Sequence, residues 1–240
     1  MSNRRTFIAL MLAAAASPAF GESPQTDERA EAAVLRLRKL YGSLKTYVDI
    51  THATTEAFGL KVSSEIRSAF AGGRLCTQTI TNGKGTFSNV IDGVHLRRWS
   101  SIKGWSDIPS LDPAIELLGG DSLSAGRSPS WLGYLLLDQR YVAEYDAHAA
   151  YHEFHGVTCT SPGSGLCTAL RAPAEGSPTS IELDPRTGAI RRMISEFPGL
   201  HLNVVADIDA HLDVPVDIDF LIREIQQHPE HTLEVMGRRI

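Results

Sequence analysis

The sequence predicts an α+β fold in which a long N-terminal helix packs on an antiparallel sheet. The dipeptides Asn82-Gly83 and Asp92-Gly93 separate short runs of β-prone residues. Both dipeptides suit the positive φ angles of a two-residue hairpin turn, so residues 74–81, 84–91 and 94–100 are expected to form a three-stranded meander. An amphipathic segment precedes the meander and further alternating segments follow it. Together these observations favour one curved sheet as the scaffold.

The N-terminus has the parts of a signal peptide. Arg4 and Arg5 are followed by an alanine-rich apolar stretch and then by the small residues Ala19 and Gly21, which suit a signal peptidase. The apolar stretch is too short to span a bilayer as a stable helix. We therefore predict that residues 1–21 are cleaved. The twin arginines fit export by the Sec or the Tat route, and either route leads to the periplasm or outside the cell.

The mature chain is acidic. Removal of residues 1–21 takes away two arginines and no acidic residue, which leaves 21 basic against 28 acidic residues and a net charge of −7. This balance disfavours nucleic acid and anionic lipid head groups as partners recognised through general charge. No later apolar run is long enough to cross a membrane, so we expect a soluble periplasmic protein.

A helix and two strands are predicted before the meander. Apolar residues recur every three or four positions over residues 27–44, with charged residues between them. Residues 47–58 and 62–70 alternate as antiparallel strands that turn at Gly59. After the meander, residues 104–108 can add a further strand.

The pattern changes between residues 107 and 140. Asp112 and Ser128 each precede a proline, and an N-cap residue followed by proline predicts the start of a helix, so two short helices are expected here. The second carries Trp131 and several leucines and is apolar nearly all round. Such a helix is buried or faces a cavity, and both core packing and a ligand wall account for it.

Strands are predicted again from Tyr141 onward, and a short helix is expected at residues 220–227. One hairpin has a turn of Ser, Pro and Gly residues between Cys159 and Cys167. In an oxidising compartment these two cysteines are expected to form a disulfide. Cys76 is then the odd cysteine, and its place in a strand favours a small buried apolar residue over a nucleophile.

The order of these elements and several motifs resemble the LolA-like superfamily of periplasmic lipoprotein carriers, within the broader group of secreted outer-membrane lipoprotein-sorting-like proteins. The matching positions span nearly the whole mature chain. They are the helix at 30–44 leading into Tyr47, Phe70 with Arg74 and Leu75, Ile91 with Asp92, Gly93 and Leu96, Gly156 with Val157 and Cys159, the turn of Leu183, Asp184, Pro185, Thr187 and Gly188, and the end at Val214, Pro215, Asp217 and Phe220.

The resemblance implies a single domain at residues 22–240, built as an incomplete antiparallel β-barrel with a long N-terminal helix and short lid helices. It also implies a hydrophobic cavity for lipid or lipoprotein acyl chains. An acyl chain needs apolar surface and no directed polar group. The residues predicted to line the cavity are Phe70, Leu75, Trp99, Trp131 and Leu135.

The match to true lipoprotein carriers has one departure. Those carriers place an arginine beside a proline to latch the lid, whereas Ala71 and Gly72 stand in that region here. Binding of a lipid or another hydrophobic ligand is therefore the broader expectation, with no cofactor and a protein of the cell envelope as a further partner.

Two other classes of function remain open: a periplasmic sensor or adaptor that uses the same fold to engage a protein partner, and a metal-dependent hydrolase. For the hydrolase, His148 and His152 have the spacing of a zinc-protease helix, but Ala149 occupies the position of its glutamate. Asp207, Asp209 and His211 share a strand face and could hold a metal ion, but the solvent face of an antiparallel strand has the same pattern. No serine-nucleophile motif occurs. We expect a binding protein, with no metal site, rather than an enzyme.

Overall fold

The computed structural model describes residues 27–81, 83–92, 95–108, 132, 135–137, 157–172 and 178–234. The helices in these ranges with defined bounds are α2 (Glu28–Ser43), the 3-10 helix η1 (Pro198–Leu200) and α7 (Ile218–Gln227). The strands are β1 (Thr46–Ala57), β2 (Leu60–Ala71), β3 (Arg74–Thr81), β4 (Lys84–Asp92), β5 (His95–Ser100), β6 (Gly104–Ile108), β7 (Thr158–Cys159), β8 (Ala169–Ala172), β9 (Thr179–Leu183), β10 (Ile190–Phe197) and β11 (Leu202–Leu212).

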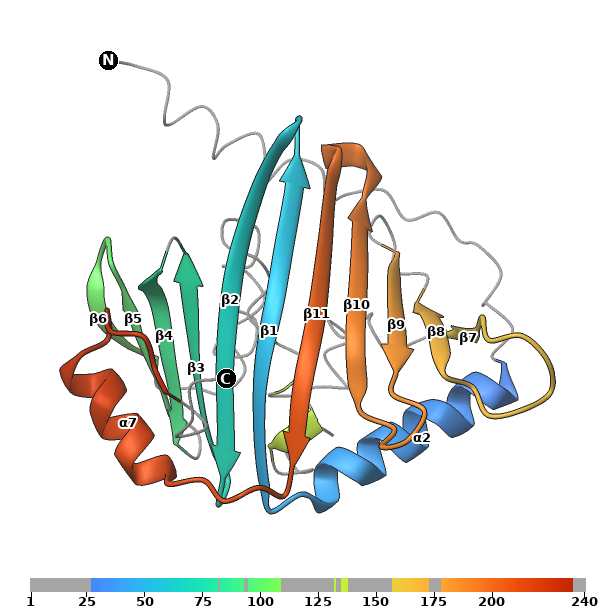
Figure 1. Ribbon diagram of the computed structural model, residues 1–240, viewed down its shortest axis with the longest axis horizontal. Helices are drawn as coiled ribbons and strands as arrows, with labels where there is room; N and C mark the ends of the chain where they lie inside the picture. The colour runs from blue at the N-terminus through green and yellow to red at the C-terminus, as the bar shows by residue number, and fades with distance from the viewer. Residues whose placement is uncertain are drawn as a thin grey trace.

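All these strands belong to one 11-stranded sheet in the order β6-β5-β4-β3-β2-β1-β11-β10-β9-β8-β7. Each half of the chain forms a meander, and the two meanders join where β1 pairs with β11, from Tyr47 opposite Leu212 to Ala57 opposite Leu202. β6 and β7 form the two edges, so the sheet stays open (Figure 1). This confirms the predicted α+β class and incomplete antiparallel barrel. The predicted lid helices lie largely outside the described residues.

The hairpins form close to the predicted turns, with two shifts. The first turn consists of Phe58 and Gly59, whose φ angles are 51° and 76°, so Leu60 already belongs to β2. The last long strand begins at Leu202, because Pro198–Leu200 form η1 and His201 has a left-handed φ of 47°. Apolar residues already alternate from Leu200 in the sequence, a pattern that by itself predicts a strand start two residues earlier.

Helix α2 forms where the apolar periodicity predicted it. Asp27 is its N-cap, and its Oδ1 accepts a hydrogen bond of 2.9 Å from the backbone N–H of Arg29. Apolar side chains spaced three or four residues apart face the sheet and are buried. They are Ala30, Ala33, Val34, Leu37 and Tyr41.

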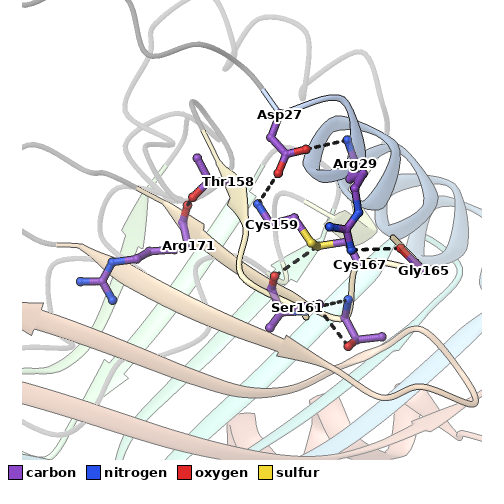
Figure 2. The surroundings of a disulfide bond; sticks show 10 residues. Asp27, Arg29, Thr158, Cys159, Ser161, Gly165, Cys167 and Arg171 are labelled. Atoms are coloured by element: carbon purple, nitrogen blue, oxygen red, sulfur yellow. Dashed lines mark hydrogen bonds between the residues drawn. A yellow bond between two sulfur atoms is a disulfide. The ribbon is translucent and has the colours of Figure 1, made fainter. Parts of the chain in front are cut away.

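Asp27 also ties the start of α2 to the strand at the far edge of the sheet. Its second carboxylate oxygen accepts a 2.9 Å hydrogen bond from the backbone N–H of Cys159, and Arg29 donates to the carbonyl of Gly165 at 3.0 Å (Figure 2). The hydrogen bond from Cys159, followed by that from Arg29, lowers the pKa of Asp27. The helix and the cysteine hairpin are thus held together at this edge.

The two helices cover opposite faces of the sheet. The α2 face carries Tyr47, Phe70 and Leu75, which share a buried cluster with α2. The α7 face carries Val48 and Cys76, which share a second cluster with Ile218, Leu221 and Ile225 of α7. In Figure 1, α2 lies at the lower ends of β7 to β10, and α7 lies beside β3 to β6. None of the described helices combines the length and apolar character that a membrane span requires.

The cysteines are arranged as predicted. Cys159 and Cys167 form a disulfide, and Ser161 closes the hairpin between them by accepting hydrogen bonds of 2.8 Å from the backbone N–H groups of Thr168 and Ala169 (Figure 2). Cys76 is free and fully buried, and its burial raises the pKa of the thiol to about 12. A thiol with so high a pKa is a poor nucleophile.

Replacing Cys159 and Cys167 together by serine is expected to lower the free energy of unfolding by about 2–3 kcal/mol, because the short loop is no longer closed in the unfolded chain. Urea unfolding of the double variant and of the oxidised wild type measures this change. The matched control is Cys76→Ala in the oxidised protein. A double variant as stable as the wild type would contradict a structural role for the bridge.

Candidate ligand-binding face

An unbroken row of apolar side chains crosses five adjacent strands on the α2 face. In the register of β1 to β5, each member lies opposite the next on the neighbouring strand. None has more than 6% of its surface exposed. At about 4.8 Å per strand the row is about 19 Å long, comparable with an extended long acyl chain. This apolar row consists of Tyr47, Phe70, Leu75, Ile91 and Leu96.

A separate group of leucines packs on the same face. Leu132, Leu135, Leu136 and Leu137, here called the leucine cluster, are 0–6% exposed and belong to the same buried cluster as the apolar row and α2. Of the predicted cavity residues, Phe70, Leu75 and Leu135 are therefore brought together. Trp131 lies outside the described residues.

Trp99 does not join them. It lies opposite Ser88 and Trp105, whereas Leu96 lies opposite Ile91. Side chains three positions apart on a strand point to opposite faces, so Trp99 is on the α7 face and half-buried. The prediction that Trp99 lines the same surface as Phe70 and Leu75 is corrected by this register.

A second row, which the sequence analysis did not identify, runs beside the apolar row and is polar. Each member is displaced by two residues along its strand from a member of the apolar row, so the two rows share the α2 face about 7 Å apart. All are buried, with Arg98 the most exposed at 8%. This polar row consists of Asp49, Ser68, Thr77, Asn89 and Arg98.

Asp49 occupies one end of the polar row and is fully buried. Its Oδ1 accepts hydrogen bonds from the hydroxyl groups of Thr51 at 3.0 Å and Ser68 at 3.3 Å. Burial raises the pKa of the carboxyl to about 7 because it disfavours the charged form, although contacts with Tyr47, Thr51 and Ser68 oppose the shift. The carboxyl therefore changes charge near neutral pH.

The middle and the other end of the polar row have different partners. Asn89 donates from Nδ2 to the hydroxyl of Thr77 at 3.1 Å. The guanidinium of Arg98 lies 5.6 Å from the centre of the Phe87 ring, a cation–π distance. Burial lowers the pKa of Arg98. The row thus presents an acid, hydroxyls, an amide and a cation along one line.

Part of the hydrogen-bonding capacity along this row is not used within the protein. Among the described residues, Asn89 Oδ1, Asp49 Oδ2 and Tyr47 Oη complete no hydrogen bond, although Tyr47 lies beside Asp49. Thr55 Oγ1, which lies further along the same face, also has no hydrogen-bond partner among the described residues. Buried polar atoms normally bond to protein or water, and an unmet group costs about 1–3 kcal/mol.

The α7 face is covered by α7 and the C-terminal segment, residues 228–234. A pocket of 240 Å³ lies between them and is lined by Gln78, Phe220, Glu224 and the stacked rings of His228 and His231. The side-chain amide of Gln78 is fully buried and bonds to the segment, which fixes it on the sheet. This pocket is separated by the sheet from the apolar and polar rows.

The residues considered for metal chemistry have other surroundings. His148 and His152 lie outside the described residues. Asp207 lies 3.5 Å from Arg192, and Asp209 lies 3.3 Å from His211, all on the α7 face. Within the described parts of the chain, no group of three or more His, Cys, Asp or Glu residues is placed to hold a metal ion.

No protein-family model matches the chain, and no curated protein does so either. Solved structures match it at the level of fold. A DUF1329 family protein from Desulfovibrio piger is 11% identical, with a TM-score of 0.42, over 84% of this chain and 96% of its own.

Two further matches have similar scores. The Mycobacterium tuberculosis lipoprotein LppX is 10% identical, with a TM-score of 0.41, over 81% of this chain and 100% of its own. A LolA superfamily protein from Nitrosomonas europaea is 10% identical, with a TM-score of 0.39, over 78% of this chain and 94% of its own. These likenesses concern the arrangement of helices and strands.

Proposed function

We propose that this protein binds a lipid or another ligand with a long acyl chain, and carries it within the cell envelope. The observation that supports this is the meeting of two apolar surfaces on the α2 face of an open sheet. One is the apolar row of β1 to β5, and the other is the leucine cluster. The proposal is of a binding protein rather than an enzyme.

The physical basis is the exchange of one apolar contact for another. An acyl chain that enters between the apolar row and the leucine cluster replaces contacts within this buried cluster with contacts to itself. Each methylene that leaves water contributes about 0.8 kcal/mol. The sheet is open at β6 and β7, so such a chain has a route to this face that a closed barrel would deny.

The proposed place of action is the periplasm. It follows from the signal peptide predicted at residues 1–21, and it is where a carrier of acyl chains between membranes would work. Fractionation of the native host, with mass determination of the protein, tests it. A chain that keeps Arg4 and Arg5 and stays in the inner membrane would contradict it.

Wild-type protein freed of lipid is expected to bind a fluorescent 16-carbon fatty acid, with affinity rising about 15-fold for each pair of methylenes added to shorter chains. Leu135→Glu is expected to abolish this binding, because a carboxylate would be placed on the apolar path. Titration by fluorescence measures both, and native mass spectrometry of protein from its own envelope identifies the natural ligand.

The matched control is Leu35→Glu, which changes the same residue type at an exposed site on α2, where 69% of the side chain is accessible. This variant should bind like the wild type. Circular dichroism establishes that both variants are folded. No binding by the wild type, or equal binding by a folded Leu135→Glu protein, would overturn the proposed site.

A protein partner is the second candidate function, and exposed apolar side chains at the tip of the β1–β2 hairpin favour it. Phe58 and Leu60 are 71% and 72% exposed, and Val62 is 41% exposed. A sensor or adaptor could use this tip to contact another envelope protein. Under that function, Phe58→Asp combined with Leu60→Asp would release the partner in a cross-linking experiment and leave acyl-chain binding unchanged.

A further inference from the structure

The polar row has no role in binding a bare acyl chain, since such a chain needs only apolar surface. We infer that Asp49, Ser68, Thr77, Asn89 and Arg98 form a subsite for an uncharged, hydroxyl-bearing head group, such as glycerol or a sugar. This inference rests on the proposed function and names the class of ligand. The inferred ligand is an amphiphile whose chain lies along the apolar row and whose head group lies along the polar row.

The register gives the first argument. Along each strand from β1 to β5, the polar residue is two positions from the apolar one, for example Thr77 from Leu75 and Asn89 from Ile91. Two residues of a strand span about 7 Å, so the rows are parallel neighbours on one face. A ligand that lies on the apolar row therefore has the polar row beside it along its length.

Burial gives the second argument. Asp49 and Ser68 are 0% exposed, Thr77 is 1% and Asn89 is 2%. A face that served only as a solid core would be more stable with apolar groups of similar shape at these positions, because burying polar groups is costly. Four such groups aligned on four neighbouring strands are not explained by packing.

The unused hydrogen-bonding atoms indicate the chemistry of the ligand. Asn89 Oδ1 accepts hydrogen bonds and has no partner among the described residues. A ligand hydroxyl donates a hydrogen bond, so it fits this atom. An anionic head would be repelled at the end of the row where Asp49 lies beside Ser68, and only Arg98 at the other end would favour it, so an anion fits one end of the row and not its length.

Four ligands with the same 16-carbon chain test the inference: a monoacylglycerol, a glucose ester, a methyl ester and the free fatty acid. The wild type is expected to bind the glycerol ester or the glucose ester at least about tenfold more tightly than the methyl ester. Tighter binding of the glycerol ester indicates a glycerol head group, and tighter binding of the glucose ester indicates a sugar head group. Isothermal titration or tryptophan fluorescence measures the ratio.

Two variants remove the subsite without changing the apolar row. Thr77→Val and Asn89→Leu should bring the ratio close to one and leave methyl-ester affinity within about twofold of the wild type. The matched control is Thr54→Val, on the α7 face of β1, which should keep the wild-type ratio. Thermal unfolding identifies any variant that fails to fold, and either row variant alone suffices for the test.

The possible outcomes separate this inference from the proposed function. Equal binding of the methyl and glycerol esters by the wild type, or a ratio unchanged in folded Thr77→Val and Asn89→Leu, overturns the subsite and leaves acyl-chain binding intact. Tightest binding of the free fatty acid overturns the uncharged head group in favour of an anion at Arg98. Failure to bind any of the four ligands overturns the proposed function itself.

Discussion

Asp49→Asn is expected to stabilise the protein relative to the wild type by an amount that grows by about 2–4 kcal/mol between pH 4 and pH 8. Asp49 is fully buried, and burial raises its pKa from 3.8 to about 7. Contacts with Tyr47, Thr51 and Ser68 lower the pKa by less, and the charge of Asp209 raises it further. Asparagine keeps an oxygen for Thr51 and Ser68 and carries no charge.

The sign follows from the direction of this shift. The pKa of Asp49 is higher in the folded protein than in the unfolded chain, so between pH 4 and pH 7 the folded protein holds a proton that the unfolded chain releases. Stability is therefore greatest below the unfolded pKa, and it falls as the pH rises toward the folded pKa of about 7. Above that pH the loss is complete, because the carboxylate is charged in both states.

Urea unfolding at several pH values measures this effect on wild type and Asp49→Asn, both freed of lipid. The matched control is Asp107→Asn on the edge strand β6, where 75% of the side chain is exposed, and it should change stability by a similar small amount at every pH. Parallel stability curves for the wild type and Asp49→Asn would show that Asp49 is not titrating in a buried site.

The scaffold could be predicted because its signals are local. The Asn-Gly turn before Lys84, the proline-free alternating runs and the helical periodicity around Leu37 each depend on a few neighbouring residues. Turn chemistry sets the register of a hairpin, so β1 to β6 follow from the sequence to within a residue or two. The two meanders then follow from the succession of hairpins, whereas the pairing of β1 with β11 that joins them into one sheet depends on residues far apart in the chain.

The choice of face could not be predicted in the same way. Leu96 and Trp99 are an odd number of residues apart and must lie on opposite faces, but each is apolar, so either face could be the one that meets α2. The answer comes from contacts with α2 and α7, which are distant in the chain. Trp99 was assigned wrongly for this reason.

The polar row was missed because no single strand reveals it. Ser68 or Thr77, taken alone, has the residue type of an ordinary solvent-facing position in an antiparallel strand. The row exists only once five strands are in register, and its burial depends on the fold as a whole. The available sequence signal is a polar residue two positions from each predicted core residue, repeated on successive strands.

The position of the C-terminal segment could not be predicted either, because it depends on contacts with residues that are distant in the chain. Residues 228–234 have no periodicity, and they are fixed by contacts with residues about 150 positions earlier. Gln78 makes three hydrogen bonds to the segment with one side-chain amide, and Arg67, Gly85 and Ser88 make others. Its Nε2 donates to the carbonyls of Pro229 at 2.9 Å and His231 at 2.7 Å, and its Oε1 accepts from the N–H of Leu233 at 2.7 Å.

Gln78→Leu is therefore expected to lower the free energy of unfolding by about 3 kcal/mol, because three hydrogen bonds are lost and the His231 carbonyl and the Leu233 N–H lose this partner, while Ser88 still donates to the Pro229 carbonyl. Leucine is close in size to glutamine, so little of the loss should come from packing. Leu233, which is 4% exposed, would be released from its cluster on the α7 face. Urea unfolding measures the loss, and proteolysis after residue 227 reports release of the segment.

A double-mutant cycle separates this contact from a general effect of Gln78 on β3. In a chain that ends at Gln227, the three partner groups are gone, and Gln78→Leu should cost little or even stabilise the protein. Gly85→Ala tests the contact from the other side, because a Cβ at Gly85 would lie 2.6 Å from the carbonyl oxygen of Pro229 and would push the segment away. If Gln78→Leu costs the same in the full and the shortened chain, the amide does not hold the C-terminal segment, and the segment must be retained by its hydrogen bonds from Arg67, Gly85 and Ser88 and by its apolar contacts.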